Sequence, residues 1–245
     1  MKLKIMQISG NKILITGGAS GIGLGLTERF IQEGNTVIVC GRREDVLASA
    51  AAKFPGVITK VCDLSDESER IELLSWVEAN HPDTNVLINN AGIQNWMRVD
   101  ADSFYDKAHE EITTNVLAPI HLANLFAGLK SIKTIMNVTS GLAFIPLAQA
   151  PVYCATKAFM RSFTLSLRRQ LKDANIEVIE IIPPALNTDL GGKGIHDAYP
   201  PVSEFIETIF EQLINGSNEL TFGMSEGRLK ANNDNIVQGF NMMNP

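Results

Sequence analysis

The sequence KILITGGASGIG, residues 12–23, joins a short apolar run to a cluster of glycines. Its apolar, β-branched first half predicts a strand that is buried on both faces. Beyond the glycines, apolar residues recur at helical spacing from Leu24 to Ile31, and Gly34 ends the pattern. A second apolar run at 36–40 then completes a βαβ unit whose first turn is rich in glycine.

The glycine cluster is suited to binding a nucleotide. Glycines let the backbone approach a pyrophosphate closely, and a helix N-terminus directs unpaired N–H groups toward it. The spacing at 16–23 is T-G-x-x-x-G-x-G, which differs from the commoner G-x-G-x-x-G fingerprint. The turn therefore predicts a dinucleotide site, and the alternative is a tight turn with a structural role alone.

Apolar runs and helical patterns alternate along the rest of the chain. Further strands are predicted at 57–61, 85–88, 134–138, 177–182 and 220–222. Further helices are predicted at 44–53, 66–80, 103–130, around Tyr153 to about 173, and 202–215. The alternation predicts an α/β fold with a doubly wound (Rossmann), mostly parallel seven-stranded sheet flanked by helices, in a single domain over residues 1–245.

Two segments lie outside this pattern. Residues 185–201 contain three glycines and several polar residues, which predicts a mobile substrate loop. Residues 223–245 are rich in asparagine with scattered apolar positions, which indicates an amphipathic tail or an interface segment.

The composition limits the classes of partner. Hydrophobic residues make up 45% and charged residues 20%, which is typical of a globular protein. The net charge of −6 argues against nucleic acid or a membrane surface as the partner. Three cysteines without paired spacing and four scattered histidines predict reduced thiols, no metal site and a cytoplasmic location.

Two arginines follow the second strand. Arg42 and Arg43 occupy the region where folds that prefer NAD carry an acidic residue, and no acidic residue occurs there before Glu44. Guanidinium groups bind phosphate through paired hydrogen bonds. The pair favours NADP(H) over NAD(H), and the alternative is two solvated charges on the following helix.

Polar and small residues follow two other strands. Asp63, followed by Leu64, ends the third strand, where it could accept from an adenine amino group or cap the next helix. Asn90, Ala91 and Gly92 follow the fourth strand and suit a cofactor crevice.

Tyr153 and Lys157 are the residues most suggestive of catalysis. On a helix, positions i and i+4 share a face, with Cβ atoms about 5–6 Å apart. A cation beside a phenol favours the phenolate and lowers its pKa, which suits proton transfer to an alcohol or carbonyl oxygen. Taken alone, such a pair is more often a chance arrangement, so the rest of the chain must decide. Asn115, within a long helical pattern, is a surface residue, a hydrogen-bonded residue or the site of a kink.

These pieces in this order resemble the short-chain dehydrogenase/reductase family. The resemblance covers about residues 10–223 and rests on the glycine motif at 16–23, N-N-A-G at 89–92, Asn115, Ser140 and Y-x-x-x-K at 153–157. The segment 140–144 and Pro183-Pro184 also resemble a bacterial subgroup named after an oxidoreductase associated with D-alanine transfer to teichoic acid.

The resemblance implies roles for individual residues. Tyr153 would be the acid–base group and Ser140 would orient the substrate carbonyl. Lys157 would lower the pKa of Tyr153 and bind the nicotinamide ribose, while Asn115 would hold a water for proton return. The implied cofactor residues are Gly17, Ser20, Gly21, Ile22, Gly23, Arg42, Arg43, Asp63, Leu64, Asn90, Ala91, Gly92, Tyr153, Lys157, Pro183 and Thr188. Pro184 replaces the family's usual glycine, which bears on the path of the loop before Thr188.

The function implied is hydride transfer between NADP(H) and a small carbonyl compound or secondary alcohol, by a homodimer or homotetramer. The alternative is a nucleotide-binding regulator or redox sensor with little turnover. The expected substrate pocket is mostly apolar, which favours an apolar substrate, with Arg98 and Lys193 as the charged candidates. Its residues are Ile93, Gln94, Trp96, Leu142, Phe144, Leu147 and Leu186.

Overall fold

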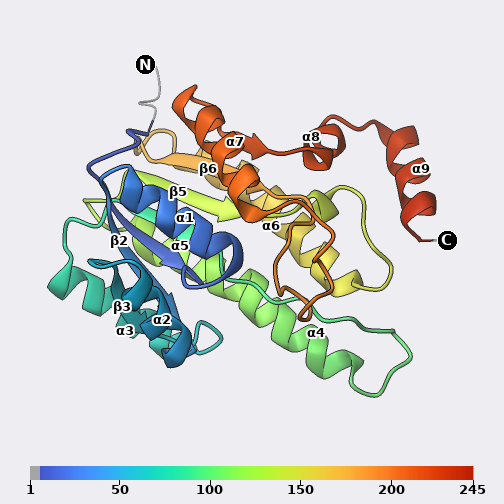
Figure 1. Ribbon diagram of the computed structural model, residues 1–245, viewed down its shortest axis with the longest axis horizontal. Helices are drawn as coiled ribbons and strands as arrows, with labels where there is room; N and C mark the ends of the chain where they lie inside the picture. Colours follow the sequence, from blue (N-terminus) through green and yellow to red (C-terminus); the bar gives the residue numbers. More distant parts are fainter. Residues whose placement is uncertain (1–5, 245) are drawn as a thin grey trace.

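A computed structural model describes residues 6–244, and across this range seven strands form one parallel sheet in the order β3-β2-β1-β4-β5-β6-β7 (Figure 1). The strands are β1 (Lys12–Thr16), β2 (Thr36–Gly41), β3 (Ile58–Val61), β4 (Val86–Asn89), β5 (Thr134–Val138), β6 (Glu177–Ile182) and β7 (Glu219–Thr221). The strand order reverses between β1 and β4, which is the point where ligands bind to such sheets. The fold is the predicted doubly wound one.

Helices connect successive strands and cover both faces of the sheet (Figure 1). They are α1 (Gly21–Gln32), α2 (Glu44–Lys53), α3 (Glu67–Asn80), α4 (Phe104–Ile112), η1 (Thr113–Leu117), α5 (Ala118–Ala127), η2 (Gly141–Ala143), α6 (Pro151–Gln170), α7 (Val202–Ile214), α8 (Met224–Leu229) and α9 (Asn233–Met243). No helix within residues 6–244 is long and apolar enough to cross a membrane.

The strands are apolar throughout because each contributes to two cores. In β1, Ile13 and Ile15 pack with α1 and α7, where Phe30 contacts Phe210 with ring centroids 4.8 Å apart. Leu14 points to the other face and packs with α3, α5 and α6. This alternation is inherent to a strand, so a sheet covered on both faces needs apolar residues at consecutive positions.

The structure corrects the prediction for residues 103–130 and adds detail to the predicted amphipathic tail or interface segment at 223–245. The long helix expected at 103–130 is interrupted by a π-helical segment, η1, that contains Asn115. The segment from 223 onward forms two helices, and α9 begins with a capping box between Asn232 and Asn235. Figure 1 shows both helices on the side toward which the β5 arrow points.

Candidate active site

The glycine turn between β1 and α1 leaves a helix N-terminus open to an anion. Gly17 and Gly21 have φ values of 62° and 51°, which favour glycine. A Cβ on Gly23 would lie 2.2 Å from the Gly17 carbonyl oxygen, so the turn closes only with glycine there. Among the described residues, the Ser20 side chain does not cap α1, and the first turn carries no acidic residue. This cradle fits a dinucleotide pyrophosphate.

Thr16 and Asn90 join the ends of β1 and β4 beside this turn. The Thr16 hydroxyl accepts from the backbone N–H groups of Asn90 and Ala91, at 2.9 and 3.0 Å. The Asn90 amide donates to the carbonyl oxygens of Thr16 and Gly17, at 2.9 and 3.2 Å. Asn90 therefore holds the shape of the glycine turn.

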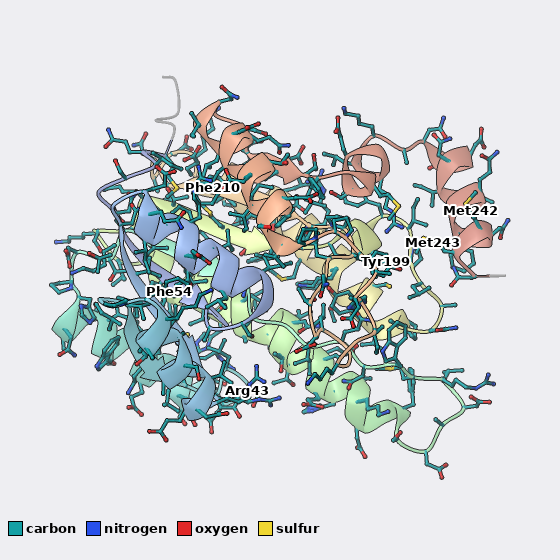
Figure 2. All side chains as sticks on the ribbon, in the orientation of Figure 1. Arg43, Phe54, Tyr199, Phe210, Met242 and Met243 are labelled. Atoms are coloured by element: carbon teal, nitrogen blue, oxygen red, sulfur yellow. The ribbon has the colours of Figure 1, made fainter. Side chains whose placement is uncertain are left out.

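The residues expected around the adenosine lie at the ends of β2 and β3. Arg42 and Arg43 are exposed, and Figure 2 labels Arg43 at the start of α2. Arg42 Nη1 lies 4.0 Å from Glu110 Oε1, a distance that leaves the guanidinium free to turn toward a phosphate. Asp63 accepts from the backbone N–H and hydroxyl of Ser65, at 2.9 and 2.8 Å.

The cap of α3 resolves an alternative that the sequence leaves open. The carboxylate of Asp66 accepts from the N–H groups of Ser68 and Glu69, so Asp66 and not Asp63 caps the helix. Leu64 between them is buried in the core beneath the sheet.

Asn115 lies in the π-helical segment and is 2% exposed. Its Oδ1 accepts from the Ile93 N–H at 2.9 Å and its Nδ2 donates to the Ile93 carbonyl at 2.8 Å. A π-helical turn widens the helix and is frequent at functional sites. Of the alternatives for Asn115, the structure therefore shows a buried, hydrogen-bonded residue within a local change of helix geometry.

Ser140, Tyr153 and Lys157 are buried and close together. The Ser140 hydroxyl accepts from the Leu142 N–H at 3.0 Å and is close enough to Tyr153 to influence its pKa. Lys157 Nζ lies 5.6 Å from the Tyr153 ring centroid and donates to the Val138 carbonyl at 2.9 Å.

The electrostatics of this pair differ from the sequence-based prediction. Burial raises the pKa of Tyr153, and the hydrogen bond from Ser140 acts against that increase. Burial also lowers the pKa of Lys157 to about 8. The net pKa of Tyr153 is therefore raised, whereas the sequence predicts that it is lowered, because burial is the largest cause of the shift.

Gly92 is where the catalytic and cofactor candidates meet. A Cβ there would lie 3.2 Å from Asn115 Oδ1 and 3.6 Å from Lys157 Nζ. Gly92 thus faces the predicted catalytic groups, while Asn90, two residues earlier, bonds to the glycine turn. The structure brings both sets together around the end of β4.

The loop of residues 183–201 runs past the segment after Ser140 and past the glycine turn. At its start, the Pro183 carbonyl accepts from the Gly141 N–H at 2.9 Å. Further along, Thr188 Cγ2 would lie 3.6 Å from a Cβ on Gly21. Thr188 therefore lies close to the glycine turn although Pro184 replaces the family's usual glycine.

Trp96 ties the same loop to the segment after β4. Its indole Nε1 donates to the Gly191 carbonyl at 2.9 Å. A Cβ on Gly191 would lie 3.3 Å from Gln94 Nε2, so Gln94 and Trp96 both contact the loop.

The residues expected to line the substrate pocket lie in different parts of the structure. Leu142 and Leu147, with Leu190 of the loop, pack against the cluster of Ala150, Tyr153 and Cys154. Leu186 belongs instead to the core beside α1 and α7. Arg98 is paired with Asp100 at 3.0 Å and its side chain is 83% exposed, which argues against a role as an anchor.

Glu111 is a buried residue that the sequence analysis missed. Its Oε1 accepts from the Asn95 N–H, and within residues 6–244 its Oε2 has no hydrogen-bond partner. Burial raises its pKa to about 7. The available signal was helical spacing, since Glu111 lies three residues after the buried Ala108 and four before Asn115.

Comparison with known proteins identifies the relatives of this chain. The sequence profile described as short chain dehydrogenase matches residues 11–198. The chain is 42% identical over 250 residues, 98% of each chain, to a Bacillus subtilis protein named uncharacterized oxidoreductase DltE. It is 30% identical over 175 residues, 70% of this chain and 71% of the other, to the NADP-dependent 3-hydroxy acid dehydrogenase YdfG of Shigella flexneri.

A solved structure has the same fold. It is a short chain dehydrogenase from Burkholderia cenocepacia in complex with NADP, with a TM-score of 0.81 and 24% identity over 92% of this chain and 93% of the other.

Proposed function

This chain belongs to the short-chain dehydrogenase family, and we propose that it uses NADP(H) to interconvert a small, largely apolar carbonyl compound and its secondary alcohol. The family and its oxidoreductase class are the starting point. The observation that carries the proposal is the meeting of Asn115 and Lys157 over Gly92, beside Tyr153 and next to the glycine turn.

The open N-terminus of α1 supports the choice of a dinucleotide. Gly17, Ser20, Gly21, Ile22 and Gly23 would hold the pyrophosphate, and Asn90, Ala91 and Gly92 the adjoining ribose. Asp63 and Leu64 would meet the adenine, while Lys157, Tyr153, Pro183 and Thr188 would contact the nicotinamide side. A nicotinamide bound there supplies or accepts the hydride.

The preference for NADP(H) rests on Arg42 and Arg43. Both are exposed at the end of β2, beside the edge of the sheet where the adenosine would lie. The Shigella relative is named as NADP-dependent and the Burkholderia structure holds NADP. These names support the same cofactor here.

The proton chemistry is assigned to Tyr153. A phenol whose pKa is raised stays protonated at neutral pH, which is the form that donates to a carbonyl oxygen during reduction. Ser140 Oγ would hold the same substrate oxygen. Lys157, whose pKa is lowered to about 8, would return the proton to Tyr153 with the help of Asn115.

The apolar surroundings of Tyr153 support the substrate class. Leu142, Leu147 and Leu190 pack around it, and Trp96 fixes the loop that covers this side. Such a pocket excludes water from the reacting oxygen.

Replacement of the proton donor tests the function. Tyr153→Phe should still bind NADPH, followed by its fluorescence, and should lose turnover of every accepted aldehyde or ketone by about a hundredfold or more. Tyr105→Phe is the matched control, because Tyr105 is 76% exposed on α4. Full turnover in the Tyr153 variant would rule out this mechanism, whereas tight NADPH binding without turnover in the wild type would favour a regulator.

We also propose a homodimer or homotetramer in the cytoplasm. Ile112, Leu117, Phe159 and Leu165 are large apolar residues between 43% and 47% exposed on neighbouring elements from α4 to α6. Such a face is suited to a partner copy. Light scattering of the purified protein measures the assembly, and cell fractionation tests the location.

A further inference from the structure

The C-terminal segment covers the connector, residues 141–152, between Ser140 and Tyr153. Asn244 Oδ1 accepts from the Ala148 N–H at 2.6 Å, and its Nδ2 donates to the Pro146 carbonyl at 3.2 Å. These bonds dock the end of α9 on the connector. The segment therefore forms one wall of the substrate side.

Arg228 of α8 lies against the connector at Gly141. A Cβ on Gly141 would lie 3.3 Å from Arg228 Cδ and 3.4 Å from its Nη1. Gly141 directly follows Ser140 in the chain. Burial raises the pKa of the Cys154 thiol, next to Tyr153, and the Arg228 guanidinium is among the groups that act against that increase. The guanidinium thus contacts the start of the connector, and its charge acts on the thiol beyond the end of the connector.

The charge of Arg228 is poorly matched by its surroundings. Within residues 6–244 no carboxylate pairs with it, and its hydrogen-bond contact is Nη2 to Met243 Sδ, at 2.9 Å. A thioether is a weak acceptor, whereas a guanidinium has five N–H donors. By contrast, Arg161 of α6 is paired with both Glu180 and Glu219.

Burial adds to this mismatch. Arg228 is partly buried, and burial is the main reason that its pKa is lowered. Met243 of α9 contacts the guanidinium, and Tyr199 of the loop influences the pKa of Arg228; Figure 2 labels both residues. A buried cation without an anion is unfavourable, so a carboxylate that entered here would relieve the cost.

We propose that Arg228 binds the carboxylate of a small oxo acid or hydroxy acid whose reacting oxygen is held by Ser140 and Tyr153. Because Gly141 lacks a side chain, Arg228 packs directly against the connector, one residue after Ser140. Leu142 and Leu147 would contact the carbon chain between the two polar ends. The inference rests on the proposed function and narrows its substrate to carbonyl compounds that carry a carboxylate.

Matched acids and esters test this assignment. The substrates are 3-oxobutanoate, 4-oxopentanoate and 5-oxohexanoate, each compared with its methyl ester and reduced with NADPH. The wild type should prefer at least one acid over its ester, since the ester keeps the carbonyl and removes the charge. Arg228→Met should lower the acid-to-ester ratio of kcat/KM by about tenfold to a hundredfold, mainly through KM of the acid.

Two further variants separate the charge from other effects. Arg228→Gln keeps hydrogen-bond donors without the charge and should also lower the ratio. Lys230→Met is the matched control on the same segment, since Lys230 pairs with Glu226 at the surface. The control should leave the ratio at the wild-type value. A thermal unfolding curve for each variant shows whether it is folded.

The possible failures are distinguishable. If acids and esters turn over at a ratio that Arg228→Met leaves unchanged, the carboxylate assignment is wrong and the oxidoreductase proposal stands. If no carbonyl compound is reduced, the binding of butanoate and its neutral analogue butanamide decides. A rise in Tm with butanoate alone, lost in Arg228→Met, supports the carboxylate site, and equal effects of the two compounds overturn it.

Discussion

The side chain of Asn115 bonds to both backbone polar groups of Ile93, at 2.9 Å to the N–H and 2.8 Å to the carbonyl. This amide therefore fixes the chain leaving β4 to the π-helical segment. The arrangement places Asn115 and Lys157 together at Gly92.

Removing this amide should affect both stability and activity. Asn115→Ala leaves the two groups of Ile93 without partners, which costs about 1–3 kcal/mol in the free energy of unfolding measured in urea. Reductase activity should fall with it. Asn80→Ala is the control, because Asn80 is exposed on α3 and its side chain donates to the Trp76 carbonyl in its own helix. Equal effects of the two variants would contradict the structural role of Asn115.

Arg42 should determine the preference for NADPH over NADH. Arg42→Asp should weaken NADPH binding about tenfold to a hundredfold more than NADH binding, because a carboxylate repels the 2′-phosphate and accepts from a ribose hydroxyl. Titration of each nucleotide by fluorescence measures both values. Arg98→Asp, at another exposed arginine, should change neither. A loss that is the same for both nucleotides would remove the phosphate role.

Glu111 should make stability depend on pH. Its ordinary pKa is 4.5 and burial raises it to about 7, so the fold favours the protonated form. The stabilisation is complete below about pH 4.5 and is lost as the pH rises through about 7. Glu111→Gln should therefore be more stable than the wild type at pH 8, on the order of 2–3 kcal/mol, and closer to it at pH 4.5.

Urea unfolding at several pH values checks this result. Glu78→Gln on α3 is the control, since Glu78 is exposed and is not among the groups that shift the pKa of Glu111. Parallel curves of stability against pH for the wild type and Glu111→Gln would refute the assignment.

Gly23 should not accept a side chain. The added Cβ would lie 2.2 Å from a backbone oxygen that cannot move without opening the turn, so Gly23→Ala should cost about 2–4 kcal/mol and abolish nucleotide binding. Gly227→Ala is the control, because a Cβ on that exposed helical glycine meets nothing within 4 Å among the described residues. Calorimetry of both variants measures the difference.

Trp96 should restrain the loop that covers the site. Trp96→Phe removes the donor to the Gly191 carbonyl, so limited proteolysis within 185–201 should become about threefold to tenfold faster. Trp76→Phe on α3, whose ring lies against His81, controls for loss of an indole elsewhere. Unchanged cleavage in Trp96→Phe would show that the contact does not hold the loop.

The fold was largely predictable because it depends on local patterns. Apolar runs such as Ile13 to Ile15 identify buried strands, and glycines at fixed spacing identify the first turn. The predicted strand boundaries agree with the structure to within one residue. Gly17, Asn90 and Ser140 closely follow predicted strands, so their position at one edge of a parallel sheet also follows from the sequence. The meeting of Asn115 and Lys157 at Gly92 does not, because both residues lie on helices.

The other features of the site depend on contacts between residues that are far apart in the sequence. Nothing near Arg228 in the chain indicates that it lies against Gly141, since that contact requires α8 to fold back over the connector. The pKa of Tyr153 was predicted in the wrong direction because helical spacing shows a neighbouring cation and does not show burial. Glu111 could not be identified from the sequence because α4 carries several other polar residues, most of them exposed, and nothing distinguishes the buried one.

The docking of α9 also sets an order of events during synthesis. Asn244 bonds to Ala148, 96 residues earlier in the chain, so the connector before Tyr153 is synthesised long before the helix that docks on it. A nascent chain can build the glycine turn and the first half of the sheet while translation continues. The contacts of α9 with residues 146–148 are then among the last to form, after the glycine turn and the strands around it have been synthesised.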